Sequence, residues 1–185
     1  MVNLEKKMET ARLLIRNFQE NDAIGCFHNW GQDNSLGKYI ILYPMKSLQE
    51  MENFINLLAL NKDAWVVLEK NTCEPIGYIT VDIPYQQLKI GEIAYAFGEK
   101  FQGKGYALEA VACVLKEYFL DRELYMIEAK YNETNVASAK LLQKMGFRID
   151  GRLRDRRIDL ATGKRNDMIV CSMKKEEFLQ RKNSL

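Results

Sequence analysis

Two glycines separate two apolar patterns of different period near the middle of this 185-residue chain. Residues 93–97 read Ile-Ala-Tyr-Ala-Phe, an alternation typical of a strand. From Ala107 onward, apolar residues recur at helical spacing, and Gly103 and Gly105 lie between the two patterns. The sequence therefore predicts a strand that ends, a short glycine turn and a helix that begins.

A helix start of this kind favours an anion. The first-turn N–H groups of a helix have no partners within the helix, and they lie at the positive end of its dipole. Glycine allows another backbone or a ligand to approach closely. We therefore expect a phosphate or pyrophosphate to bind here.

Two common phosphate motifs fail at this stretch. A Walker loop would begin at Gly98, but Gly105 stands where the magnesium-binding Ser or Thr is required. The dinucleotide fingerprint requires Gly or Ala three residues after Gly105, and the chain has Leu108. Each motif therefore lacks a residue that it needs in order to bind its ligand.

A third motif fits. The run Gln102-Gly103-Lys104-Gly105-Tyr106-Ala107 resembles the Gln/Arg-x-x-Gly-x-Gly/Ala signature of the GNAT acetyltransferase superfamily. In that family, successive backbone amides hold the pyrophosphate of acetyl-coenzyme A. The resemblance implies a coenzyme site made of Ala96, Phe97, Gly98, Gln102, Gly103, Lys104, Gly105, Tyr106, Ala107, Asn135 and Ser138.

A second signature follows in the expected order. Asn135-Val136-Ala137-Ser138, with Gly146-Phe147 after it, resembles the GNAT pattern Asn-x-x-Ala/Ser followed at a fixed distance by Gly-Phe. The likeness runs from about Met8 to Glu176 and is similar to the branch of the ribosomal-protein N-terminal (RimJ/RimL-like) acetyltransferases. Joint occurrence of both signatures is far harder to obtain by chance than either alone.

The expected fold class is α/β with a mixed sheet, the GNAT fold, in which about seven mostly antiparallel strands have helices on both faces. We expect residues 1–7 to be a flexible extension and residues 8–185 to form a single domain. Apolar periodicity and turn signals place strands at 12–18, 64–68, 79–83, 90–97, 123–131, 147–157 and 167–173, with a turn at 161–164 between the last two. Helices are expected at 20–30, 47–60, 107–120, 135–146 and 174–182.

Composition narrows the function classes. A net charge of +2 without a long basic run argues against nucleic-acid binding driven by charge. Four dispersed cysteines and one histidine favour neither a zinc site nor a disulfide framework. The start of the chain does not resemble a signal peptide, and there is no run of eighteen apolar residues. We expect a cytoplasmic protein that uses no metal and does not bind a membrane.

Acetyl transfer to an amine requires a base. An amine with a pKa near ~10 is protonated at neutral pH and cannot attack a thioester until a proton is removed. Glu92, at the start of the strand before the glycine turn, matches a position where many family members place that base. The alternative interpretation is a solvated carboxylate at a strand end.

The leaving thiolate benefits from a proton, and the family often takes it from a tyrosine seven residues after the motif asparagine. That position is Leu142 here, so this donor is missing. Ser138 is the substitute that the ribosomal branch implies, and Tyr131 is the second choice. Ser138 has a competing interpretation as a first-turn residue that only satisfies backbone groups.

Three further assignments concern binding. Asn135 is expected to cap its helix and to bind the pantetheine arm through its side-chain amide. The resemblance assigns the amides of Phe97 and Gly98 to the coenzyme arm and the oxyanion. Lys104 either adds charge beside the phosphates or is merely solvated. Four arginines, Arg152, Arg154, Arg156 and Arg157, lie close together near the end of the chain. They could bind an acidic acceptor, but we favour the interpretation that they form a charged strand edge.

The leading hypothesis is an N-acetyltransferase that moves an acetyl group from acetyl-coenzyme A to a primary amine, such as a protein N-terminus, by direct attack in a ternary complex. A small-molecule acceptor, either a polyamine, an amino acid or an aminoglycoside, is the alternative within the same chemistry. A catalytically silent coenzyme A sensor is the alternative from another class. We expect a monomer or a homodimer.

Overall fold

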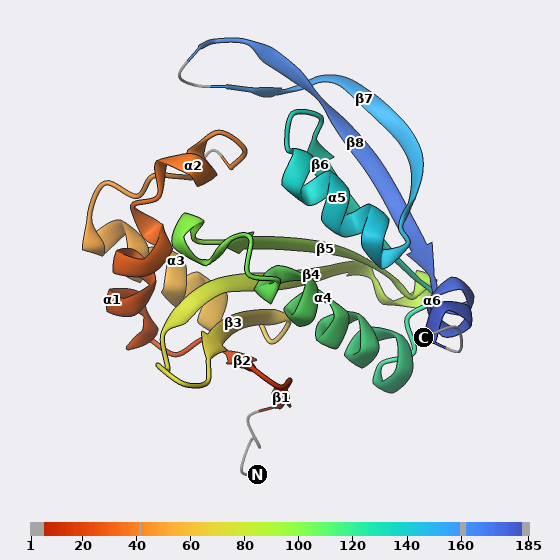
Figure 1. The fold of residues 1–185 in the computed structure, drawn as a ribbon, viewed down its shortest axis with the longest axis horizontal. Coiled ribbons are helices and arrows are strands. Elements are labelled where there is room, and N and C mark those ends of the chain that lie inside the picture. Colours follow the sequence, from red (N-terminus) through yellow and green to blue (C-terminus); the bar gives the residue numbers. More distant parts are fainter. Residues whose placement is uncertain (1–5, 41, 160–161, 183–185) are drawn as a thin grey trace. The chain divides into compact units, whose positions relative to one another are not determined.

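The computed structural model describes residues 6–40, 42–159 and 162–182. The strands of this part are β1 (Lys7–Glu9), β2 (Leu13–Asn17), β3 (Ala64–Glu69), β4 (Pro75–Tyr85), β5 (Ile90–Phe97), β6 (Met126–Asn132), β7 (Arg148–Ile158) and β8 (Arg165–Lys174) (Figure 1). The α-helices are α1 (Asp22–Cys26), α2 (Asn34–Gly37), α3 (Leu48–Ala59), α4 (Tyr106–Lys116), α5 (Val136–Met145) and α6 (Lys175–Lys182). Shorter helical turns are η1 (Phe27–Gly31), η2 (Gln86–Leu88), η3 (Glu99–Phe101) and η4 (Glu117–Asp121).

The eight strands of the described residues form one sheet in the order β1-β2-β3-β4-β5-β6-β8-β7. β5 and β6 pair in parallel, whereas β1 with β2, β2 with β3, β3 with β4, β6 with β8 and β7 with β8 pair antiparallel. The expected mixed α/β fold class is confirmed. The strand beyond the expected seven is β1, which pairs Met8 with Ile15 and lies partly in the segment expected to be an extension.

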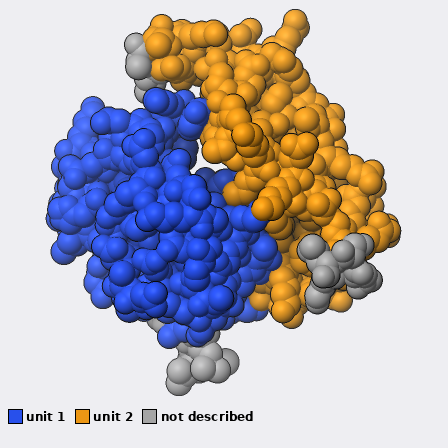
Figure 2. Space-filling view, in the orientation of Figure 1, with its two compact units in different colours: residues 1–80, 95–113 blue, residues 81–94, 114–185 orange. Residues whose placement is uncertain are grey.

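Two compact units divide the chain (Figure 2). The first consists of residues 1–80 and 95–113, and the second of residues 81–94 and 114–185. β4, β5 and α4 each contribute residues to both units. The expectation that residues 8–185 act as one domain stays a prediction.

In the first unit, aromatic side chains form the centre of the core. Trp30 packs against Tyr78 with ring centroids 5.2 Å apart and against Tyr43 at 6.1 Å. α3 begins as the sequence predicts, because the Ser47 hydroxyl accepts a hydrogen bond from the Glu50 N–H at 3.3 Å. The short helix α2 lies in residues 31–45, a stretch where the sequence predicts neither a helix nor a strand.

In the second unit, β7 and β8 form the long blue ribbon of Figure 1, which joins the sheet through the pairing of β8 with β6. Phe119 in η4 packs on Phe178 in α6, with ring centroids 5.2 Å apart. The predicted turn between β7 and β8 is present at Gly163, whose N–H donates to the Asp159 carbonyl, and Ala161 lies outside the described residues. Helices in the described residues are too short or too polar to cross a membrane.

Candidate functional site

In the first unit, β5 ends in a turn that leads to the two glycines. The Phe101 N–H donates to the Gly98 carbonyl at 2.9 Å, which closes the η3 turn. The side-chain amide of Gln102 donates back to the Phe97 carbonyl at 3.0 Å. Gln102, the first residue of the predicted coenzyme signature, therefore holds the end of β5 through its side chain.

Both glycines of the turn have left-handed backbone conformations. Gly103 has φ 73° and Gly105 has φ 82°, a region that costs a residue with a side chain about 1–2 kcal/mol. α4 begins at Tyr106, and its first-turn N–H groups, including that of Ala107, have no helical carbonyl one turn earlier. The predicted strand, glycine turn and helix start are thus present within this unit.

Gly98 is required for a different reason. A Cβ at this position would lie 2.6 Å from the Asn29 carbonyl oxygen, so a side chain does not fit. The Gly98 N–H donates to the Ile76 carbonyl at 3.1 Å. Because this donor already has a partner, we do not propose the Gly98 amide as an oxyanion ligand, and this part of the expected assignment is revised.

Arg12, the residue just before β2, holds the glycine turn and α4 together. Its guanidinium donates to the Glu109 carboxylate through Nε at 2.7 Å and to the Lys104 carbonyl through Nη1 at 3.0 Å. The Thr10 hydroxyl donates to the same carboxylate at 2.5 Å. Burial alone would raise the pKa of Glu109, but the hydrogen bonds from Thr10 and Arg12 outweigh it and lower the pKa.

Tyr106 completes this cluster. Its ring lies 4.5 Å from the Arg12 guanidinium carbon, and its hydroxyl donates to the Glu69 carboxylate. That hydrogen bond lowers the pKa of Glu69 and raises the pKa of Tyr106. The Lys104 ammonium lies 5.7 Å from the Phe101 ring centroid. Tyr106, which the motif assigns to the coenzyme, thus uses its hydroxyl to attach the helix start to β3.

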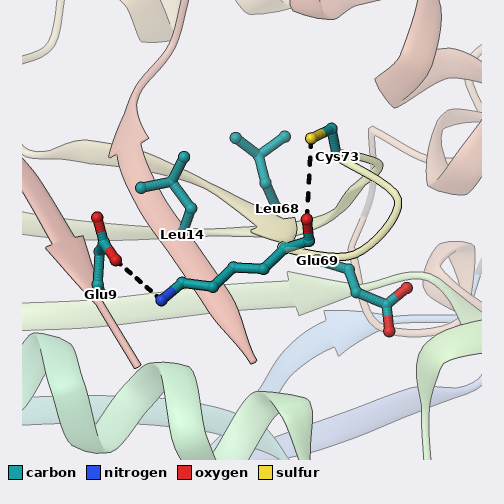
Figure 3. Close-up of a pocket in the computed structure, with 6 residues that line it drawn as sticks. Glu9, Leu14, Leu68, Glu69 and Cys73 are labelled. Atoms are coloured by element: carbon teal, nitrogen blue, oxygen red, sulfur yellow. Dashed lines mark hydrogen bonds and ion pairs between the residues drawn. The ribbon is translucent and has the colours of Figure 1, made fainter. Parts of the chain in front are cut away.

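A small hollow lies beside this cluster, bordered by β1, β2 and β3 (Figure 3). Its volume is about 120 Å³, and its lining residues are Glu9, Leu14, Leu68, Glu69, Lys70 and Cys73. Drug-sized ligands occupy pockets of roughly 300–1,000 Å³. The hollow is therefore too small for coenzyme A, and it contains no residue that the sequence assigned to the site.

In the second unit, the proposed base forms an ion pair. Glu92 Oε2 accepts a hydrogen bond from Lys130 Nζ at 2.5 Å, and both side chains are more than a third exposed. The parallel register pairs Glu92 with Glu128, so a second carboxylate stands on the neighbouring strand. Lys130 thus occupies an oxygen that Glu92 would use as a general base.

The start of α5 agrees with the second signature. Asn135 Oδ1 accepts a hydrogen bond from the Ser138 N–H at 3.1 Å, which confirms the predicted N-cap. The helix ends at Gly146, whose φ of 97° is the predicted left-handed terminator. Leu142 is buried at 2% exposure, so the position that often carries the acid tyrosine belongs to the core here.

Tyr131 lies on the other side of the sheet from Glu92. In the β5–β6 register, Glu92 pairs with Glu128, and Tyr131 is three residues further along β6. Because side chains alternate between faces, this odd spacing separates Tyr131 from Glu92. Burial raises the pKa of the Tyr131 hydroxyl, and Cys171 adds to the effect. The structure therefore does not bring these two predicted catalytic residues together.

Of the four arginines in β7, Arg152 has a structural task. It pairs with Glu133 at 2.7 Å and with Asp167, and thereby connects the turn before α5 to the β7–β8 ribbon. The Asp155 N–H donates to Asp167 at 2.9 Å, at a bulge where Asp155 has φ 55°. Hydrogen bonds lower the pKa of the Asp167 carboxyl: the one from the Asp155 N–H has the larger effect, and the one from Arg152 the next largest. The charged-edge interpretation favoured from sequence agrees with these contacts.

Sequence reasoning assigned no role to several residues that hold the site. Arg12 and Glu109 are 97 positions apart, and Lys130 and Glu92 are 38 positions apart, so no local pattern pairs them. The likeness to the ribosomal branch extends over Arg12 but assigns it no role. Which partner it meets depends on the packing of β2 against α4.

The comparisons with known proteins identify the family. The acetyltransferase (GNAT) domain model matches residues 12–148. The uncharacterized N-acetyltransferase p20 of Bacillus licheniformis is 32% identical over 174 residues, which cover 91% of this chain and 96% of that protein. The ribosomal protein uS5-alanine N-acetyltransferase of Escherichia coli is 32% identical over 63 residues, 34% of this chain and 32% of that one.

A solved structure agrees with these matches. The GNAT-family acetyltransferase of Bacillus anthracis superposes with a TM-score of 0.82 at 25% identity, over 93% of this chain and 100% of that chain. The match of the family model covers well over half of the 185 residues, and p20 aligns along nearly its whole length. This chain is a member of the GNAT acetyltransferase family.

Proposed function

We propose that this protein transfers an acetyl group from acetyl-coenzyme A to a primary amine in a ternary complex, with a protein N-terminal amine as the acceptor. One observation carries the proposal. Gly103 and Gly105 both adopt left-handed conformations immediately before α4, which leaves backbone N–H groups at the helix start for a diphosphate. Family membership makes acetyl-coenzyme A the donor to test.

The coenzyme contacts are proposed residue by residue. The amides from Gly103 to Ala107 bind the diphosphate, and Lys104 adds positive charge beside it. Asn135 has one side-chain oxygen engaged in capping, which leaves its NH₂ group to donate to the pantetheine arm. Ala96 and Phe97, at the end of β5, complete the arm site, and the Phe97 amide is the proposed oxyanion donor.

In the reaction, Glu92 takes a proton from the ammonium form of the acceptor, directly or through water. The free amine attacks the thioester carbonyl carbon, a C–N bond forms, and the carbonyl oxygen becomes an oxyanion. The C–S bond then breaks, the carbonyl re-forms, and the attacking nitrogen gives up its surplus proton, so that a neutral amide remains. The coenzyme sulfur receives a proton, and the coenzyme leaves as a thiol. Ser138 is the proposed hydrogen-bond partner of that sulfur. Tyr131 is the less favoured one, because it faces away from Glu92.

A protein acceptor is preferred to a small molecule because one relative acts on the alanine terminus of a ribosomal protein. An acceptor screen tests this choice. Peptides with free N-termini, polyamines, amino acids and aminoglycosides are incubated with acetyl-coenzyme A, and the products are detected by mass. Acetylation confined to small amines would replace the proposed acceptor class. Coenzyme binding without any product would favour the sensor alternative.

The Glu92→Gln substitution tests the base. We expect kcat to fall by about 10²–10⁴-fold with little change in coenzyme affinity, because a proton acceptor is lost while the shape is kept. Glu128→Gln is the matched control, since it removes the carboxylate that stands beside Glu92 on β6. A large loss in Glu128→Gln together with normal turnover in Glu92→Gln would transfer the role to Glu128.

A further inference from the structure

Arg12 contacts Lys104, Tyr106 and Glu109 at and beside the predicted diphosphate site, although it lies more than ninety residues earlier in the chain. We propose that Arg12 is a positioning residue that orients the peptide between Lys104 and Gly105 for the diphosphate, with Glu109 as its anchor. This inference rests on the proposed function, because it concerns the same coenzyme site. Arg12 itself touches no reacting atom.

The orientation follows from peptide geometry. Arg12 Nη1 donates to the Lys104 carbonyl at 3.0 Å and so holds that carbonyl toward β2. In a trans peptide the carbonyl and the following N–H point in opposite directions. The Gly105 N–H is therefore directed away from Arg12. A Cβ on Gly105 would lie 3.5 Å from Arg12 Nη2, an ordinary contact distance, so the guanidinium lies directly beside this glycine.

Glu109 fixes the guanidinium in place. Its Oε2 accepts from Arg12 Nε at 2.7 Å and pairs with Nη2 at 2.6 Å, so two guanidinium nitrogens converge on one carboxylate oxygen. Its Oε1 accepts from the Thr10 hydroxyl at 2.5 Å and from the Arg12 backbone N–H at 3.0 Å. Three hydrogen bonds and an ion-pair contact thus hold one carboxylate, and all of them come from the segment between β1 and β2.

The ion pair between Arg12 and Glu109 also reduces the negative charge near the proposed diphosphate. Glu109 lies in the first turn of α4, where a free carboxylate would repel the diphosphate bound at the same helix start. Arg12 neutralises this carboxylate at close range. Tyr106 covers the guanidinium with its ring at 4.5 Å and is tied to Glu69 through its hydroxyl. The cation is therefore held by the protein and positions the loop, while the backbone amides face the ligand.

The experiment compares two acetyl donors that differ in the diphosphate. Acetyl-coenzyme A carries it and S-acetylpantetheine does not, and the acceptor is the best amine from the screen. For Arg12→Ala we expect KM for acetyl-coenzyme A to rise about ten- to a hundredfold with kcat within about twofold. The kcat/KM for S-acetylpantetheine should stay unchanged. Arg12→Lys should recover only part of the loss, because one ammonium lacks the planar set of donors with which the guanidinium contacts Glu109 and the Lys104 carbonyl together.

Lys70→Ala is the matched control. Lys70, the residue after β3, also joins two segments through an ion pair, with Glu9 at 2.8 Å, and its ammonium donates to the Thr10 carbonyl, but within the described residues it has no contact with the glycine turn. It should leave both donors unaffected. Equal losses with both donors in Arg12→Ala, or an unchanged KM together with a lowered melting temperature, would mean that Arg12 only stabilises the fold and would overturn the inference.

Hydrogen exchange of the ligand-free protein separates this inference from the proposed function. In Arg12→Ala we expect amides 103–108 to exchange at least about fivefold faster, with the amides of α5 unchanged. If the wild-type protein transfers no acetyl group, the proposed function fails, and exchange still decides whether Arg12 holds the loop. Unchanged exchange at 103–108 would refute the inference even in an active acetyltransferase.

Discussion

The starts of α4 and α5 use opposite solutions to the same problem. At α5, Asn135 accepts the Ser138 N–H at 3.1 Å, so the protein itself satisfies part of the helix start. At α4, no side chain within the described ranges accepts from the N–H groups of Tyr106 or Ala107. Two left-handed glycines precede that helix instead. A capped start stabilises a helix, whereas an uncapped start keeps its donors for a ligand.

The two starts also differ in what holds them. The turn before α5 is attached by charged side chains of the β7–β8 ribbon, through Glu133, Arg152 and Asp167. The turn before α4 is attached through its carbonyl at Lys104, by Arg12. In both cases an arginine from a distant part of the sequence holds a loop whose own residues are small or polar. Rigid support of this kind is what a precise binding site requires.

The largest effect is expected from Gly105→Glu, which adds bulk and negative charge where the diphosphate is proposed to bind. Coenzyme A binding, measured by calorimetry, should be abolished while the circular dichroism spectrum persists. Gly105→Ala separates strain from charge, because it costs about 1–2 kcal/mol of stability for the left-handed backbone alone. Unchanged coenzyme affinity in Gly105→Glu would mean that the start of α4 does not bind the diphosphate, and the proposed functional difference between the starts of α4 and α5 would be wrong.

Gly146→Ala is the control for that comparison. Gly146 also has a positive φ, at the end of α5, and a Cβ there would meet the Arg181 side chain at 2.5 Å. The substitution should lower stability by a similar amount and leave coenzyme affinity unchanged. A parallel loss of affinity in both variants would show that backbone strain, and not the diphosphate site, controls binding.

A smaller effect is expected at Asn135, where capping and coenzyme binding can be separated. Asn135→Ala should cost about 1 kcal/mol of stability and raise KM for acetyl-coenzyme A, because the cap and the NH₂ donor are both lost. Asn135→Ser keeps a capping oxygen without that donor. It should retain most of the stability and still raise KM. If KM in Asn135→Ser equals the wild-type value, the residue acts as a cap alone.

The smallest expected effect is on the stability of the fold at acidic pH. Because Glu109 is hydrogen-bonded as a carboxylate, its pKa is lower in the folded state than in the unfolded state. Its contribution to stability is full above the unfolded value of about 4.3 and is lost as pH falls through the lower folded value. Urea unfolding between pH 6 and 3 should therefore show a shallower acid loss in Glu109→Gln. Asp82→Asn, at an exposed position of β4, should keep the wild-type slope.

Local signals predicted much of this structure. The strand ending at Phe97, the glycine turn, the Asn135 cap and the Gly146 terminator all lie where periodicity and capping residues placed them. Errors occurred where the local signal was weak. Strand β6 begins at Met126, later than the expected 123, because Glu123 has φ 56° and the Leu124 N–H donates to the Tyr118 carbonyl instead of to a neighbouring strand. The added strand β1 is only three residues long and is stabilised by pairing with β2.

The chain order of amino acids determined which segments become helices and strands and which backbone can take a left-handed turn, because these depend on neighbours a few residues apart. Tertiary structure decided which side chains meet. The pairing of Glu92 with Lys130, the separation of Glu92 from Tyr131 and the hold of Arg12 on Lys104 and Glu109 all follow from strand register and from packing between distant segments. Contacts across many residues depend on the whole sheet, and no short pattern encodes them.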